Sequence, residues 1–440
     1  MPKQYVNLPS NPKKQHGKTL KLEARVTGLA VGKPATLVWK VEPVGTDNTD
    51  LKFLARKQRA RLRKKETRRT GAKKGDTLFP NKLDLPHVGG DIHRVTCWRK
   101  DAPANILSTT DYETWRKIFY TVHYMNQQCL NTFQAVQARF EQAFAEGYIE
   151  IDERQRLQTL KDEPMTDAKN AALPHLYRRK PALADKPFHL RIVVVNDLYD
   201  KETADYEETG KTVSPVTIQT DQPLVSGKRW LLRARARIEG TPKKPWRNVK
   251  RWTTRTSDTD VEIDLTKRKE FVKALAAGKT IGVNLRVRER SHYLGHSIGN
   301  FCCVRINETG TPAQIEQIIL QTFTHETGHG FQQAVRRERL HDAKGNRAKG
   351  AGAWEKNAHW HDDEYGGVGP HCSTNARLVP SLDTSSSQIY EHDSGTLCTM
   401  FYRGDTAVDV DGSFCSSCLP RLERVDLGAA QMLRQGWTRY

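Results

Sequence analysis

The chain has 440 residues, a formal net charge of +20 and 37% hydrophobic residues. This length allows two or three domains with a sizeable core, and the composition lies at the polar end of the soluble range. No apolar run is long enough to span a bilayer, and the opening Met1-Pro2-Lys3-Gln4 lacks the hydrophobic stretch of a signal peptide. We therefore expect a protein made in the cytoplasm without a transmembrane segment.

The N-terminal part has the pattern of a β-rich module. Residues 20–26 and 36–41 alternate apolar and polar side chains, with Gly and Pro between them. We expect a β-sandwich-like module over residues 1–105, interrupted by a basic insertion at 52–74.

The basic insertion contains a single acidic residue, Glu66. Such a run can bind the phosphates of nucleic acid or anionic lipids, because each paired Lys or Arg releases counterions. No aromatic residue follows Phe53 in it to stack on bases, so a solvated loop is favoured and nucleic acid is not the expected partner. We interpret the alternating Arg233, Arg235 and Arg237 as the solvent-exposed face of a strand.

A helical segment is expected over residues 106–184. Thr110 and Glu113 form a capping-box pattern, and apolar residues then recur at helical spacing. The recurring residues are Trp115, Ile118, Phe119, Val122 and Met125. They are interpreted as core.

Residues 185–440 are expected to form an α+β domain, with a mixed sheet and one prominent helix. Strands are predicted over 190–195, 230–238 and 281–287, and a helix over 311–336. Thr311, Pro312 and Gln314 give that helix a capping box with proline at its first position. An exposed edge strand of such a sheet can hold an extended substrate by β-augmentation.

The predicted helix contains a pattern that is typical of zinc peptidases. His325 and His329 are four residues apart, and Glu326 directly follows the first. On a helix both imidazoles share a face and can bind one Zn²⁺, with Glu326 directed at the water that the metal would hold. The sequence therefore predicts a zinc-dependent peptidase that uses Glu326 as its general base.

A site with two histidine ligands needs a third protein ligand and an open position for water. His371 is the best candidate, because it follows a Gly-rich turn that can bring the backbone close to a metal. The alternatives are Asp362, Glu364, His361 and Glu391.

The eight cysteines are too few for a disulfide scaffold. Four near the C-terminus can close a tetrahedral site for a second, structural Zn²⁺, or can pair as disulfides in an oxidising space: Cys372, Cys398, Cys415 and Cys418. The other four lie in apolar segments and are interpreted as core: Cys97, Cys129, Cys302 and Cys303.

The order of HExxH, HC, CxM and CxxC resembles the archaemetzincin family of metzincin zinc peptidases, over about residues 311–420. The resemblance implies a zincin-like domain with His325, His329 and His371 on the catalytic zinc, and with four cysteines on a structural zinc. It also implies a Met-turn at Met400 beneath the site. Tyr402 is a candidate oxyanion donor, with Tyr365 as an alternative.

Two features depart from the metzincin pattern. Gln332 stands where the pattern has glycine, and residues 334–370 must be an insertion before His371. These departures leave the third ligand open.

The overall layout also resembles metallopeptidase effectors of bacterial type VI secretion systems. That resemblance implies an antibacterial or anti-host toxin exported by a contractile injection machine, with a protein or peptide substrate. A secretion-machine component or an immunity protein would be its partner.

Two rival functions remain open. One is a nucleic-acid-binding protein with a structural zinc ribbon and no hydrolase activity, which the basic insertion would favour. The other is a non-catalytic module in which two zinc sites only hold a loop-rich C-terminus together.

Overall fold

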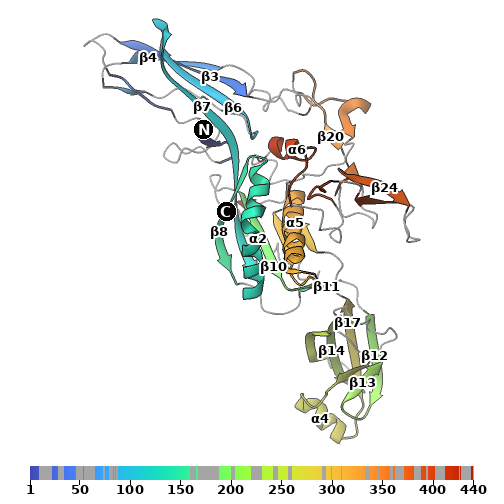
Figure 1. Ribbon diagram of the computed structural model, residues 1–440. Coiled ribbons are helices and arrows are strands. Elements are labelled where there is room, and N and C mark those ends of the chain that lie inside the picture. The colour runs from blue at the N-terminus through green and yellow to red at the C-terminus, as the bar shows by residue number, and fades with distance from the viewer. Residues whose placement is uncertain are drawn as a thin grey trace.

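The computed structural model describes residues 1–8, 22–27, 34–45, 53, 65–72, 75–78, 83, 85, 88–158, 165–166, 188–199, 204–219, 230–240, 246–255, 260–289, 294–298, 300–308, 310–331, 337–344, 346–356, 360–361, 371–380, 388–392, 395–401, 412–425, 427 and 438–439. The fold is α+β, with a large mixed sheet and few helices. Three units follow one another along the molecule in Figure 1, with the N-terminal strands at the top and an inserted β unit at the bottom.

The large sheet has the strand order β18-β19-β10-β7-β6-β3-β4, and β1, β8 and β26 pair beside this path. The bounds are β1 (Lys3–Tyr5), β3 (Ala35–Gly45), β4 (Lys65–Ala72), β6 (Ile92–Arg99), β7 (Ala102–Tyr124), β8 (Ile149–Leu157), β10 (Phe188–Val195), β18 (Gly295–Ile298), β19 (Phe301–Arg305) and β26 (Thr438–Arg439). β7, β8, β10 and β19 run parallel, whereas β18 is antiparallel to β19.

The long strand β7 corrects one expectation from the sequence. A helix was expected to begin near Thr110, but residues 102–124 are extended, and the helix of this region begins only at Gln127. The second half of β7 is buried on both faces, so its apolar residues do not alternate and can mimic helical spacing. β7 also crosses the boundary expected near residue 105 and joins the N-terminal strands to the central unit.

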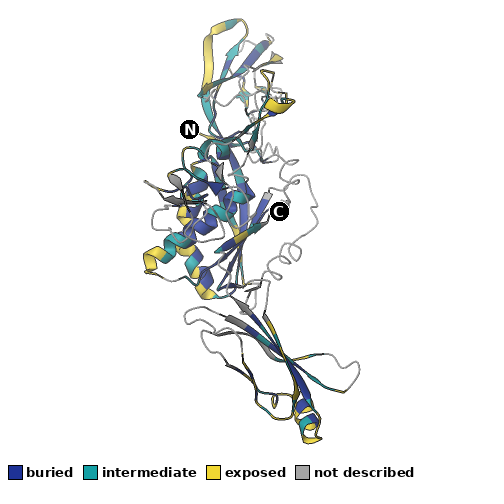
Figure 2. Ribbon diagram, turned by 90° about the vertical axis from the view of Figure 1, so that its right-hand side faces the viewer, coloured by how far each residue is buried: buried dark blue, intermediate teal, exposed yellow. Residues whose placement is uncertain are grey.

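Two long helices, α2 (Gln127–Ala145) and α5 (Pro312–Gly330), pack against each other and cover one face of the central sheet. Asn126 caps α2 by accepting from the Cys129 amide at 3.0 Å, and α5 begins with the predicted capping box. Phe133 of α2 meets Phe323 of α5 edge to face, with ring centroids 5.1 Å apart. Figure 2 shows the buried residues concentrated in this unit.

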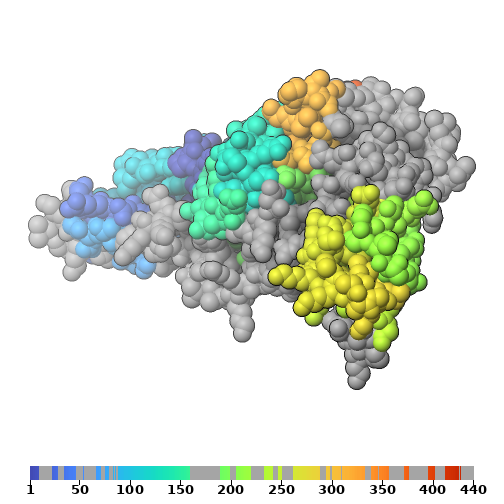
Figure 3. Space-filling model, turned by 90° about the horizontal axis from the view of Figure 1, so that it is seen from below, coloured from blue at the N-terminus to red at the C-terminus, as the bar shows by residue number. Residues whose placement is uncertain are grey.

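The inserted β unit lies in the chain between β10 and β18 and has a hydrophobic core of its own. It contains β12 (Ala204–Lys211), β13 (Val216–Gln219), β14 (Trp230–Ile238), β15 (Arg247–Arg255), β16 (Asp260–Ile263), α4 (Lys269–Ala276) and β17 (Ile281–Glu289). A four-stranded sheet, β12-β17-β14-β15, faces the pair β13-β16. In Figure 3 this unit is coloured green to yellow and lies at the end of the molecule nearest the viewer. The strands predicted over 230–238 and 281–287 are confirmed.

The N-terminal unit has a third core, in which β3, β6 and the first half of β7 are covered on one side by β2 (Ala24–Arg25) and β5 (Thr77–Leu78). Its main strands continue the large sheet, and the layer opposite them contains two strands within the described ranges. Within the basic insertion, β4 pairs with β3, and Phe53 is the only other described residue.

The remaining elements are short. They are β9 (Met165–Thr166), β11 (Leu198–Tyr199), β20 (Arg337–Arg339), the 3-10 turn η3 (Ala351–Ala353), β21 (Trp354–Lys356), β22 (Trp360–His361), β23 (His371–Cys372), β24 (Ala376–Pro380), β25 (Gln388–His392) and α6 (Leu419–Arg424). Within the described ranges, no helix combines the length and apolar character needed to cross a membrane.

Candidate metal centre

The last turns of α5 present His325, Glu326 and His329. The preceding residues Ile319, Leu320 and Phe323 anchor the helix in the core, so the opposite face turns away from it. All three side chains keep intermediate exposure. The helix therefore fixes the three side chains and leaves each of them partly accessible.

His371 of β23 completes a group of three histidines. It lies 40 residues or more beyond the α5 pair in the sequence, yet one ring nitrogen from each of the three lies within 4.8 Å of the others. Its ring is stacked on that of His325, with centroids 5.2 Å apart. The residue is buried, with 1% of its surface exposed. The structure thus brings His325, His329 and His371 together, as the sequence predicted.

The geometry and protonation of this group fit zinc. His325 Nε2 lies 3.0 Å from His329 Nε2, close to the roughly 3.3 Å expected between two nitrogens of a tetrahedral zinc. Burial lowers the pKa of His325 to about 4 and the pKa of His329 well below its usual value. Both imidazoles are therefore neutral near pH 7, which metal binding requires.

A backbone carbonyl orients His325. Its Nδ1 lies 2.8 Å from the Thr399 oxygen, which can only accept, so Nδ1 carries the proton and Nε2 keeps its lone pair. Thr399 is held in turn by its amide, which donates to the Ser413 carbonyl at 2.8 Å. This kind of support fixes the tautomer of a metal-binding histidine.

Glu326 faces the edge strand β18. Burial raises the pKa of its carboxyl to about 7, and a hydrogen bond from Ser297 of β18 lowers it in part. Helix and strand approach closely here, because a Cβ on Gly295 would come within 2.8 Å of Glu326 Cγ. Glycine at 295 therefore lets β18 lie directly against the glutamate.

Met400 packs against α5 at Gly328, the residue before His329. It is fully buried, and a Cβ on Gly328 would come within 2.5 Å of its sulfur. The Met400 carbonyl accepts from the Cys372 amide at 2.9 Å, which joins the turn at 398–401 to β23.

A second group consists of four cysteines, Cys372, Cys398, Cys415 and Cys418, whose sulfurs lie within 4.8 Å of one another. None is in a disulfide, and three are buried. A hydrogen bond from Cys372 lowers the pKa of Cys415, whereas burial raises that of Cys398. Four sulfurs this close together have the arrangement of a tetrahedral Cys₄ zinc site.

Several candidates from the sequence lie outside the described residues: Tyr402, Tyr365, Asp362 and Glu364. His361 and Glu391 belong to β22 and β25, and only their backbone is described. Sequence reasoning missed Ser297, Gly295 and Thr399. No motif marks them, since each acts through its position beside α5.

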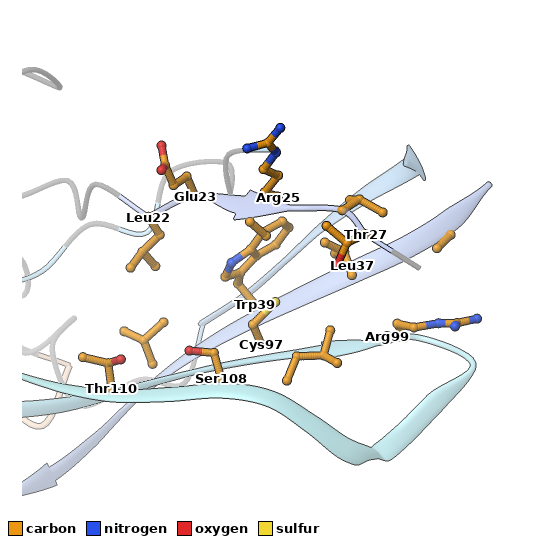
Figure 4. Close-up of a pocket in the computed structure, with 15 residues that line it drawn as sticks. Leu22, Glu23, Arg25, Thr27, Leu37, Trp39, Cys97, Arg99, Ser108 and Thr110 are labelled. Carbon is orange, nitrogen blue, oxygen red and sulfur yellow. The ribbon is translucent and has the colours of Figure 1, made fainter. Parts of the chain in front are cut away.

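Figure 4 shows a cavity of about 450 Å³ in the N-terminal unit. Leu22, Trp39 and Cys97 are among its lining residues, and none of these belongs to the histidine or cysteine group. Glu23 and Arg25 at its rim point away from it in Figure 4. This cavity is a feature of the N-terminal core.

A scan against protein-family models gives no match, and searches of curated proteins and of solved structures likewise give none. Any functional inference for this chain therefore depends on its own residues.

Proposed function

We propose that the chain is a zinc-dependent peptidase with a zincin-like central unit. The observation that carries this proposal is the convergence of His325, His329 and His371 on one point beside Glu326. Three imidazoles, of which His325 and His329 are neutral near pH 7, are the donor set of a catalytic zinc that keeps a position for water, whereas a purely structural site is closed by four protein ligands.

The sheet supports the same proposal. The four parallel strands are bordered on one side by β18, an antiparallel edge strand that lies beside α5 and Glu326. Among the described strands, β18 pairs only with β19. An extended peptide can add to the outer edge of β18, which would bring its backbone to Glu326.

Zinc held by the three histidines would polarise the scissile carbonyl and make a water molecule more acidic. Glu326 takes the proton from that water and later delivers it to the leaving amine. A carboxyl pKa raised to about 7 suits a group that must both accept and donate a proton near neutral pH. Ser297 holds the carboxylate on the side of β18.

The four cysteines would hold a structural zinc. Their four sulfurs, all within 4.8 Å of one another, match the closed tetrahedral arrangement. We propose that this second metal fixes β23 and the turn at 398–401, both of which contribute to the histidine site.

The test is the substitution Glu326→Gln, measured with casein as a generic substrate. The amide cannot accept the proton, so hydrolysis should fall on the order of 10²-fold or more, while zinc content stays unchanged. Glu316→Gln, on the exposed surface of the same helix, is the matched control and should cleave like the wild type. Full activity in Glu326→Gln would reject the mechanism.

The expectation of an injected toxin remains part of the proposal and has its own test. Wild-type protein produced in the cytoplasm or periplasm of a bacterium should slow growth, whereas Glu326→Gln should not. Equal growth inhibition by both forms would separate toxicity from hydrolysis.

A further inference from the structure

The inserted β unit has an arginine-rich sheet face that the hydrolytic site does not use. On β14, Leu232, Ala234 and Ala236 are buried in the unit's core, so the alternate residues project from the opposite face. That face carries Arg233, Arg235 and Arg237 of β14 and Arg286 of β17, here called the arginine face.

The register of the sheet brings like charges together. Arg233 lies directly opposite Arg286 in the β14–β17 pairing, and Arg235 is the next outward residue along β14. Like charges directly opposite on one face are unfavourable. Burial, followed by the charges of Arg286 and Arg233, lowers the pKa of Arg235.

Two of these arginines already bind carboxylates from an extended strand. Arg286 Nε lies 2.9 Å from Asp205 Oδ1, and an Arg237 nitrogen lies 3.1 Å from Glu207 Oε1. Asp205 and Glu207 are alternate residues of β12. Carboxylates two residues apart on an extended segment are therefore spaced to pair with arginines of this face.

For Arg233 and Arg235, amides on β15 and β17 respectively take the place of carboxylates. Arg233 donates to Asn248 Oδ1 at 2.8 Å, and Arg235 donates to Asn284 Oδ1 at 3.2 Å. The Arg235 Nε is buried and has no acceptor among the residues that the structure describes. Glu239 adds a third carboxylate beside Arg237, so four guanidinium groups and three carboxylates leave the described part of the face with a net positive charge.

The arginine face is linked to the proposed substrate strand. β17 ends at Glu289 and β18 begins at Gly295, so the connection can span at most roughly 20 Å. A polypeptide that adds to β18 can therefore reach the inserted unit with a modest extension.

We propose that the arginine face is an exosite for an acidic segment of the protein substrate. This inference rests on the proposed peptidase function. Carboxylates suit it because a guanidinium binds them through two parallel hydrogen bonds, and the sheet holds these forks in a fixed register. Binding there raises the local concentration of the scissile segment at β18.

The binding arm of the test uses full-length Glu326→Gln protein and fluorescent polyglutamate or polyglutamine peptides. Polyglutamate should bind, and Arg233→Gln/Arg235→Gln should weaken it about tenfold. The double variant Arg94→Gln/Arg139→Gln removes two exposed charges from other units and should bind like the parent. Arg233→Lys/Arg235→Lys keeps the charge and should retain part of the affinity.

The kinetic arm compares one casein-derived substrate with either a polyglutamate or a polyglutamine tail. In an otherwise wild-type chain, Arg233→Gln/Arg235→Gln should raise KM about tenfold for the acidic substrate, with kcat and the polyglutamine substrate unchanged.

Unaltered polyglutamate binding in the Arg233→Gln/Arg235→Gln protein would overturn the exosite, as would an equal loss in the control double variant. Preferential binding of oligothymidylate at this face would also overturn it and assign the face to nucleic acid. If no substrate is cleaved but the binding result holds, the peptidase proposal fails while the acidic-segment site stands.

Discussion

His371 and Cys372 are adjacent in the sequence, yet their side chains belong to two different groups of potential metal ligands. The turn at 398–401 has the same double character, because Cys398 joins the cysteines while the Thr399 carbonyl accepts from His325. The cysteine group therefore holds both a histidine of the proposed catalytic site and the carbonyl that orients another.

This relationship predicts that the two metal sites are coupled. Cys415→Ser/Cys418→Ser should remove one zinc, lower the melting temperature and weaken zinc retention by the histidines about 10- to 100-fold. Competition with a graded series of chelators measures the retention. Cys97→Ser, a buried cysteine of the N-terminal core, is the control and should leave it unchanged. Undiminished retention in the double variant would mean that the sites are independent.

Arg116 should be among the most sensitive structural positions. Its guanidinium is fully buried and donates to the carbonyls of Leu422 and Glu423 in α6 and of Gly147 before β8, at 2.6 to 2.7 Å. Arg116→Met removes the donor to all three carbonyls, of which that of Glu423 keeps a second one in the Gly89 amide, and should cost about 3 kcal/mol or more of unfolding free energy.

Chemical denaturation of Arg116→Met provides this measurement. Arg94→Met removes an exposed arginine paired with Asp111 and should cost about 1 kcal/mol or less. A similar small loss at Arg116 would show that α6 does not depend on it. Arg116→Lys should rescue little, because one ammonium group cannot reach carbonyls on both sides.

Stability should fall on mild acidification because of two buried histidines. Burial, with the charge of Arg191, lowers the pKa of His123 to about 4 and that of His189 to about 3. Below pH 6.5 the unfolded chain binds protons at these sites and the folded chain does not, so the folded state loses stability until the pH reaches those values.

Between pH 7 and pH 5 each histidine should contribute a loss of about 2 kcal/mol. Urea unfolding of the wild type and of His189→Gln at both pH values measures the difference. The variant should lose less stability than the wild type over this interval. If both proteins lost the same unfolding free energy between pH 7 and pH 5, His189 would not contribute to the pH dependence of stability.

Ser297 is predicted to position the general base. Ser297→Ala removes the hydroxyl that donates to Glu326, so kcat should fall about tenfold with zinc content unchanged. Ser297→Thr keeps a hydroxyl and should restore most of the rate. If alanine and threonine behave alike in kcat, the hydrogen bond has no role in orienting Glu326.

The helix that carries the histidine pair could be predicted from local sequence. Thr311, Pro312 and Gln314 act within one turn, and the structure has the expected capping box with α5 beginning at Pro312. The strands at 190–195 and 281–287 were also predictable, as runs of β-branched and aliphatic residues.

The error at residues 106–124 has a physical cause. Ile118, Tyr120 and Val122 face one side of β7 and Trp115, Phe119 and Thr121 the other, and nearly all are buried. A strand that is covered on both faces lacks the two-residue alternation by which strands are recognised. Its neighbours β8 and β10 follow later in the chain, so the local sequence does not reveal them.

The site was only partly predictable for a similar reason. The spacing of His325 and His329 is local, whereas Ser297 and Thr399 reach the site through sheet pairing and a turn. His371 was inferred from the Gly-rich turn before it, and the structure brings it to the pair. The separate core of the inserted β unit was not anticipated, because its strands resemble those of the main sheet in composition.

The central claim is that the three histidines hold a metal beside Glu326, and zinc stoichiometry tests it most directly. Metal analysis of the purified protein should find two zinc per chain. His325→Ala/His329→Ala should retain one, and adding Cys415→Ser/Cys418→Ser should remove both. Two results would contradict the account: no zinc in the wild-type protein after zinc-supplemented purification, or an equal zinc content in the wild type and in His325→Ala/His329→Ala.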